Sequence, residues 1–176
     1  MTASTTLIME TQTSRGGAEA FADIVREHQS MVFSIAYHFL RDRAQAEDVA
    51  QEVFFRLSRR LSSMESTLHR VRWLRKVTAR LCIDEIRRRP PVGPLDELAE
   101  SIPGSPDEDV LESRRLRALV AALPERARMT LILRYQEEME PAEIAKVLNE
   151  SVHTVKSRLQ RALASLRERF TRREGP

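Results

Sequence analysis

Residues 18–89 contain no glycine and no proline, and this feature restricts the possible fold more than any other. Both residue types interrupt regular helices, glycine because of its backbone entropy and proline because it lacks an N–H group. Helix formers such as Ala, Leu, Glu, Arg and Gln dominate the stretch, and no alternation of β-branched residues persists in it. The sequence therefore predicts an all-α protein.

Glycine and proline gather instead in residues 90–106, which hold five of the eight prolines and two of the five glycines. This composition is typical of a linker. We therefore expect two small helical domains joined by an acidic, Pro-rich linker. The predicted divisions are a disordered tail over 1–18, a first domain over 19–90, a flexible linker over 91–111 and a second domain over 112–173.

The charges follow the same division. Residues 91–112 contain seven Asp or Glu and no Lys or Arg, whereas residues 1–90 hold 15 Lys or Arg against 11 acids and residues 113–176 hold 14 against 8. The two basic blocks indicate a polyanionic partner, although a basic face can also be simply solvated. The acidic linker is either a soluble spacer or a segment that its charge keeps off DNA.

Several classes of protein are disfavoured. Cys82 is the only cysteine, so the chain can form no internal disulfide, and its four histidines show no metal-ligand spacing. The N-terminus has no secretory signal pattern, and no apolar run approaches the roughly 18 residues that span a bilayer. We find no Gly-rich phosphate loop and no pairing of a nucleophile with a base. We expect a cytoplasmic, non-enzymatic protein without cofactor, metal or membrane insertion.

Three helices are expected in the first domain. The pattern of apolar side chains places them at about 21–40, 44–61 and 68–89, and Pro90 cannot continue the last one. In the third helix Trp73 accompanies a dense row of arginines. It is either a core residue or a platform on which a nucleic-acid base stacks.

The second helix has an aromatic residue on its polar side. Val49, Val53 and Leu57 share one face, while Phe55 lies on the opposite face among acidic side chains. A phenylalanine in this position is either covered by a neighbouring segment or anchors a partner protein.

The second domain contains the signals of a helix-turn-helix unit. Pro124 and Pro141 each occupy a natural first helical position, and Asn149 tolerates the left-handed conformation that closes a helix. Ser151 follows as the N-cap of the next helix. A short helix, a tight turn and a second helix form the unit.

The helix after Ser151 combines two faces. Its apolar stripe is expected to pack on the preceding helices and consists of Val152, Val155, Leu159, Leu163, Leu166 and Phe170. Opposite the stripe, small polar side chains and two arginines have the composition of a recognition helix in the DNA major groove. They are His153, Thr154, Ser157, Arg158 and Arg161. The alternative is a charged surface helix of a bundle.

Three motifs together resemble the bacterial sigma factors of the sigma-70 family, in particular the small extracytoplasmic-function (ECF) subgroup. AEDVAQEVFFRL (46–57) is similar to region 2.2, and WLRKVTARLCIDEIRRR (73–89) to regions 2.3 and 2.4. The third motif, which is similar to region 4, is LPERARMTLILRYQEEMEPAEIAKVLNESVHTVKSRLQRALASLR (123–167). The motifs occur in the family's order and cover most of the chain.

The resemblance implies a factor that binds core RNA polymerase, recognises the −10 and −35 promoter elements and promotes transcription initiation. Region 2.2 would bind the clamp coiled coil of the polymerase β′ subunit through Asp48, Gln51, Glu52 and Phe55. The β flap of polymerase, promoter DNA and an anti-sigma protein that holds the chain inactive are the other implied partners.

The resemblance also implies two sets of DNA-binding residues. Unpaired −10 bases would be captured by Arg72, Trp73, Lys76, Arg80, Asp84, Arg87 and Arg88. The −35 element would be read by His153, Thr154, Ser157, Arg158 and Arg161, with Lys156 near phosphates. Because Arg80 stands where the family usually has Asn, and His153 where it often has Gly, no promoter sequence is carried over.

Two other functions remain open from the sequence. A stand-alone helix-turn-helix regulator would bind duplex DNA without polymerase. An interaction module, such as a polymerase decoy or an anti-sigma protein, would bind its partner without directing transcription.

Overall fold

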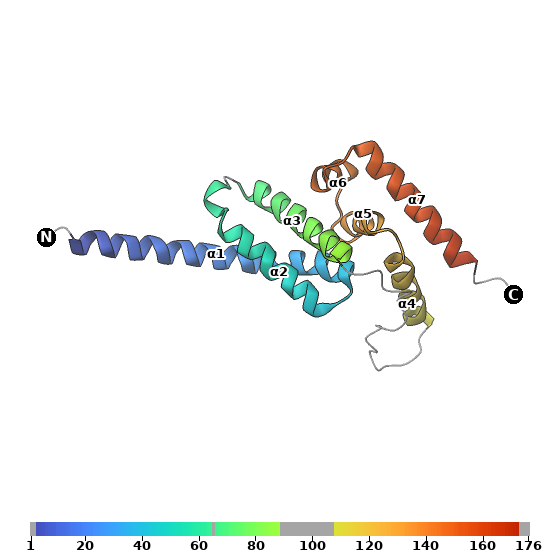
Figure 1. Ribbon diagram of the computed structural model, residues 1–176, viewed down its shortest axis with the longest axis horizontal. Helices are drawn as coiled ribbons and strands as arrows, with labels where there is room; N and C mark the ends of the chain where they lie inside the picture. Colours follow the sequence, from blue (N-terminus) through green and yellow to red (C-terminus); the bar gives the residue numbers. More distant parts are fainter. Residues whose placement is uncertain (1–2, 65, 89–107, 173–176) are drawn as a thin grey trace.

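Every regular element of the protein is a helix in the parts of the chain that the computed structural model describes, residues 3–64, 66–88 and 108–172. The elements are α1 (Ala3–Leu40), α2 (Arg43–Ser58), η1 (Leu61–Ser63, a 3-10 helix), α3 (Thr67–Arg88), α4 (Glu108–Ala121), α5 (Glu125–Tyr135), α6 (Pro141–Leu148) and α7 (Val152–Thr171) (Figure 1). The prediction of an all-α fold is thereby confirmed. Of the predicted linker, residues 91–107 lie outside the described parts, and α4 begins at Glu108.

Helix α1 is longer than the sequence indicated. Its end at Leu40 agrees with the prediction, but it begins at Ala3, within the segment 1–18 for which disorder was expected. Residues 1–40 contain no proline, so every backbone N–H group can join the ladder of hydrogen bonds, and the helix includes Gly16 and Gly17 at an entropic cost. In Figure 1 the first half of α1 extends away from the other helices.

Helices α1, α2 and α3 pack together around a buried apolar core. Its fully buried side chains include Ile35, Phe39, Val53, Leu57 and Leu74. Between the first two helices, the Asp42 carboxylate accepts a hydrogen bond from the backbone N–H of Gln45 at 3.0 Å and so caps α2. Cys82 is fully buried in the same core, and burial raises the pKa of its thiol to about 12. It therefore acts as a small apolar residue.

Helices α5, α6 and α7 form the helix-turn-helix part of the chain. Pro141 is the first residue of α6, and Asn149 closes that helix in the left-handed region with φ 54° and ψ 53°. The Ser151 side chain accepts a hydrogen bond from the backbone N–H of Thr154 at 3.0 Å. These three predictions are confirmed. Pro124 caps α5 instead of starting it, so this helix begins one residue later than predicted.

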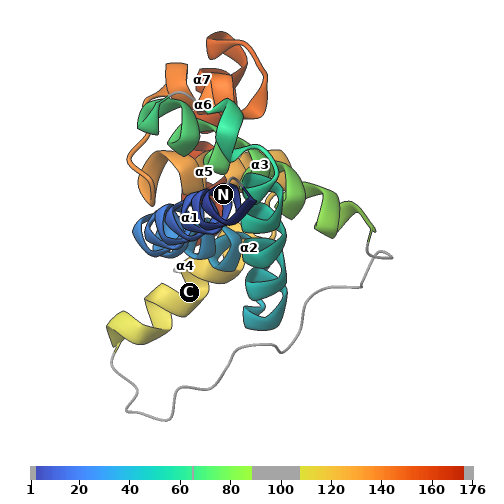
Figure 2. The same ribbon diagram turned by 90° about the vertical axis from the view of Figure 1, so that its left-hand side faces the viewer.

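The two groups of helices also pack against each other. Helix α3 contacts α5 and α6, and α1 contacts α5, so one continuous cluster of buried apolar side chains runs through both groups. Figure 2, which looks nearly along α1, shows α2 beside it and α6 and α7 above it. The arrangement leaves the outer faces of α2, α3 and α7 as candidates for binding.

Candidate functional site

The outer face of α2 exposes an aromatic side chain among polar groups. Phe55 is 52% exposed, and the Arg59 guanidinium lies 4.2 Å from the centroid of its ring. Beside it, Glu52 accepts a hydrogen bond from Arg56 Nε at 2.6 Å. Asp48 and Gln51 are exposed on the same helix. Since no segment in the described part of the chain covers Phe55, its environment favours the anchor interpretation over a packed rim.

Helix α3 carries a row of charged side chains that winds around its surface. Arg72, Lys76, Arg80, Asp84 and Arg88 follow one another at four-residue intervals. Because each interval turns about 40° further around the helix, the row winds through about 160° between its two ends. The four cations are exposed, and Arg80 lies 3.7 Å from Asp84. This row brings together five of the seven residues expected to bind −10 DNA.

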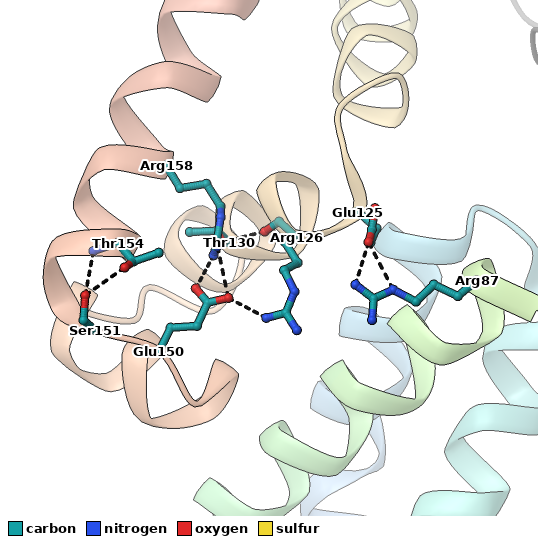
Figure 3. Close-up of polar contacts among 8 residues, drawn as sticks. All are labelled: Arg87, Glu125, Arg126, Thr130, Glu150, Ser151, Thr154 and Arg158. Atoms are coloured by element: carbon teal, nitrogen blue, oxygen red, sulfur yellow. Dashed lines mark hydrogen bonds and ion pairs between the residues drawn. The ribbon is translucent and has the colours of Figure 1, made fainter.

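The other two members of that set, Trp73 and Arg87, have neighbours elsewhere in the fold. Trp73 is partly buried against the core, which favours the core interpretation for its ring. Arg87 donates two hydrogen bonds to Glu125 of α5, from Nε at 3.1 Å and from Nη2 at 2.8 Å (Figure 3). The hydrogen bond from Arg87 lowers the pKa of the Glu125 carboxyl from its ordinary value.

Helix α7 has the two faces that the sequence predicted. Val155, Leu159 and Leu166 are buried, and Leu163 and Phe170 are partly buried. Val152, assigned to the same stripe, is 39% exposed instead. On the outer face, His153, Lys156 and Arg161 are exposed, and Thr154 and Ser157 are partly exposed.

Arg158 does not join these outward-facing residues. Its side chain is 16% exposed, and its Nη2 atom donates to Glu150 Oε1 at 3.0 Å while Nη1 bonds the other carboxylate oxygen. Nη1 also lies 3.4 Å from the hydroxyl of Thr130, a fully buried residue of α5. The structure therefore places Arg158 in a polar network within the domain.

The sequence patterns assigned no role to two residues of this region. Gln160 is exposed on the outer face of α7, and its position three residues after Ser157 was a signal that could have identified it. Glu150 lies in the turn between α6 and α7 and joins Arg126 to Arg158. No periodic pattern includes a turn residue, so no signal in the sequence indicated this role.

In the described parts of the chain, no group of three or more His, Cys, Asp or Glu side chains could hold a metal ion. None of the helices described has the length and apolar character needed to cross a membrane.

Comparisons with known proteins agree with this arrangement. The family model for sigma-70 region 2 matches residues 24–90, and the model for sigma-70 region 4 matches residues 113–166. The ECF RNA polymerase sigma factor SigW of Bacillus subtilis is 30% identical over 174 residues, which cover 90% of this chain and 93% of SigW.

Two solved structures share the fold. CnrH in complex with the cytosolic domain of CnrY has a TM-score of 0.65 at 23% identity and covers 93% of this chain and 96% of its own. The sigma factor RpoE of Bartonella quintana, in complex with the anti-sigma factor NepR, has a TM-score of 0.64 at 17% identity. The match covers 85% of this chain and 96% of RpoE. The sequence relationships favour a polymerase-dependent factor over a stand-alone regulator. The chain belongs to the ECF sigma factors of the sigma-70 family.

Proposed function

We propose that promoter recognition is divided among three outward-facing surfaces of this sigma factor. The polymerase face on α2 consists of Asp48, Gln51, Glu52 and Phe55. The −10 surface on α3 consists of the exposed side chains Arg72, Lys76, Arg80 and Arg88 with Asp84 between them, joined by Arg87, which is bonded to Glu125, and by Trp73, which is partly buried. The −35 face on α7 consists of His153, Thr154, Lys156, Ser157, Gln160 and Arg161. The predicted domain boundaries, 19–90 and 112–173, are part of the proposal.

The observation that carries the proposal is the two-sided character of α7. One side is buried against α4, α5 and α6, and the other presents polar side chains at the start of a capped helix. Arg161 has the geometry to bind guanine in bidentate fashion and Gln160 to bind adenine, each such pair discriminating by about 1–3 kcal/mol.

Opening the −10 region requires free energy, because each DNA stacking step is worth about 1.4 kcal/mol. We expect the chain to act as a non-enzymatic binding protein that contributes by holding unpaired bases on the cationic row of α3. Core polymerase supplies the remaining contacts and, by tethering both DNA-binding surfaces, raises their effective concentration at the promoter. The protein would accordingly act in the cytoplasm, beside polymerase.

The expected inhibitory partner has a candidate position in this fold. A groove of about 420 Å³ between α1, α4, α5 and α7 is lined mainly by apolar side chains. Leu116 and Tyr135 of this lining are exposed. His38, Arg41 and Arg117 lie beside them, and burial followed by the two neighbouring arginines lowers the pKa of His38. An inhibitor with an acidic amphipathic helix fits a groove that is apolar inside and basic at its edge.

Run-off transcription with core polymerase tests the proposed function. The expected result is transcription from a defined start site on templates that carry both promoter elements, with loss when either element is replaced. A gel shift without polymerase provides the second arm. Tight sequence-specific binding of duplex DNA by the chain alone, without stimulated transcription, would overturn the proposal in favour of a regulator.

A further inference from the structure

One carboxylate ties together the turn and two helices of the helix-turn-helix unit. Glu150 follows the left-handed residue Asn149, and its side chain is only 13% exposed. It accepts hydrogen bonds from Arg126 of α5 and from both terminal nitrogens of Arg158 of α7 (Figure 3). We call these three residues the Glu150 clamp.

The clamp is connected to the buried part of the domain. Arg158 Nη1 lies 3.4 Å from Thr130 Oγ1, and the same hydroxyl donates to the Arg126 carbonyl at 2.6 Å. Burial alone would raise the pKa of Glu150, but the hydrogen bonds from Arg158 and Arg126 outweigh it and lower the pKa. The carboxylate therefore stays charged, with two guanidinium groups to compensate it.

This geometry occupies the end-on fork of Arg158, because both terminal nitrogens donate to the Glu150 carboxylate. An arginine that reads guanine must aim two N–H groups at the O6 and N7 atoms of the base, whereas the Arg158 side chain is turned into the domain and is only 16% exposed. Arg161, in contrast, is exposed on the outer face of α7 and bonds only the Ser157 carbonyl in the described structure, at 3.2 Å.

We propose that Glu150 is a positioning residue for −35 recognition and that Arg158 acts through it instead of reading a base. The clamp fixes the rotation of α7 relative to α5, so that His153, Ser157 and Arg161 face the major groove together. This inference deepens the proposed function and rests on it.

The test compares Glu150→Gln, Arg158→Ala and the double variant in the full chain with core polymerase, at a temperature where circular dichroism shows each variant folded. We expect each single variant to reduce transcription from −35-dependent promoters on the order of tenfold, and the double variant to lose no more, because coupled residues are not additive. A library of −35 sequences should show unchanged base preference for all three. Arg161→Ala, which should change the preference at one position, is the positive control.

A charge exchange sharpens the test. Combining Glu150→Arg with Arg158→Glu keeps an ion pair at the clamp while removing the arginine from α7, and Arg126→Gln in the same chain removes the cation that would repel the introduced arginine. We expect this triple variant to restore most of the lost transcription. The acid-to-amide variant Glu168→Gln, at an exposed position near the other end of α7, is the matched control and should leave transcription unchanged.

Two results would overturn the inference. One is a relaxed preference at a single −35 base in Arg158→Ala with no effect of Glu150→Gln, which would make Arg158 a base reader. The other is full activity of both single variants. If the unmodified chain itself directs no promoter-specific transcription, the proposed function fails, and this outcome is distinct because it appears before any variant is compared.

Discussion

Phe55 exposes half of its surface although a phenylalanine side chain gains free energy on burial. Its neighbour Phe54 is buried in the core, so the two residues form a matched pair. We expect Phe55→Ala to weaken binding to core polymerase by about 2 kcal/mol or more, as for an interface anchor. The free energy of unfolding should stay unchanged. Phe54→Ala should lower the free energy of unfolding by about 3–5 kcal/mol through the cavity it leaves. Polymerase titration and urea denaturation measure both, and strong destabilisation by Phe55→Ala would place that ring in the core.

Arg161 and Lys156 should contribute to −35 binding in different ways. Removal of Arg161 is expected to cost about 1–3 kcal/mol and to relax specificity at one base pair. Removal of Lys156 should weaken binding to all sequences alike, as for a phosphate contact. It should also reduce the slope of the logarithm of the binding constant against the logarithm of the salt concentration by about 1. Holoenzyme binding to single-base promoter variants at several salt concentrations separates the two. An equal loss on every sequence for Arg161→Ala would assign it to the backbone instead.

The place of Phe55 on the polar face of α2 followed from the sequence, because it depends only on the helical repeat and on the residues of the same helix. Whether a neighbouring segment covers it did not follow, since that depends on the packing of other helices. The same reasoning placed Arg158 on the outer face of α7, and the structure turns it toward Glu150. That contact depends on the left-handed conformation of Asn149, which brings a turn residue within reach of α7. The helical repeat of α7 gives no information about a partner in the turn before it. The sequence of α7 alone therefore did not indicate the contact between Arg158 and Glu150.

At the scale of helices, the turn between α6 and α7 is determined by its caps. We expect Ser151→Ala to reduce the free energy of unfolding by about 1 kcal/mol, since it removes the acceptor of the Thr154 N–H group at the start of α7. Ser151→Asp retains an acceptor at the N-cap and should be close to neutral. Urea denaturation followed by circular dichroism measures both, and equal stability of the alanine and aspartate variants would contradict the capping role.

Helix ends were predictable where a residue with a strong positional preference marks them, as at Pro141 and Asn149. The end of α1 at Leu40 was predictable from the place where its apolar pattern stops. The start of α1 was not predictable, because residues 1–18 carry no sustained apolar periodicity of the kind that marks the rest of the helix. Pro124 illustrates a smaller error. Proline is compatible with both the cap and the first helical position, and the sequence alone does not distinguish the two.

At the scale of the molecule, the contact between the two groups of helices was not predictable, since its partners are far apart in the sequence. Arg128 is buried, donating to the Phe39 carbonyl at 3.1 Å with its guanidinium 4.7 Å from the Phe39 ring centroid. Arg75 lies 3.5 Å from Glu137, and Arg87 bonds Glu125. Two cations of the helix expected to meet −10 DNA are therefore paired with carboxylates of the helix-turn-helix part.

These two carboxylates should respond to pH in opposite directions. Burial raises the pKa of Glu137, so the folded chain holds that proton more tightly than the unfolded chain does, and its contribution to stability falls as the pH rises toward the raised value. The hydrogen bond from Arg87 lowers the pKa of Glu125, so its contribution is present above its ordinary pKa and is lost as the pH falls through the lowered value. In the unmodified chain, Glu137 should therefore make the protein less stable as the pH rises above the ordinary range of a carboxyl, and Glu137→Gln should abolish this decrease. Glu125 should make the protein less stable as the pH falls below that range, and Glu125→Gln should abolish that decrease. Denaturation across this range checks both signs, and identical profiles for the two variants would contradict them.

The packed arrangement has a consequence for promoter binding. The −10 and −35 elements are about 25 base pairs apart, which at 3.4 Å per base pair is roughly 85 Å along the DNA. Helix α3 contacts α5 and α6, so the surfaces proposed for the two elements belong to one packed body in this structure. We therefore expect the two groups of helices to separate when both elements are bound, and the Arg87–Glu125 contact to break when they do.

Separation can be measured with dyes on cysteines introduced at the exposed residues Ser63 and Glu168, because buried Cys82, with a pKa of about 12, should not react. We expect Glu125→Gln to shift the ratio of packed to separated molecules about two- to fivefold toward separation, the effect of losing a partly exposed ion pair. Glu138→Gln removes the same charge from an exposed position between α5 and α6 and should leave the ratio unchanged. Adding core polymerase and promoter DNA should separate the dyes in every variant, since the bound form spans both elements. An unchanged dye distance on promoter binding would mean that the packed form itself binds DNA, and the requirement for separation would then be wrong.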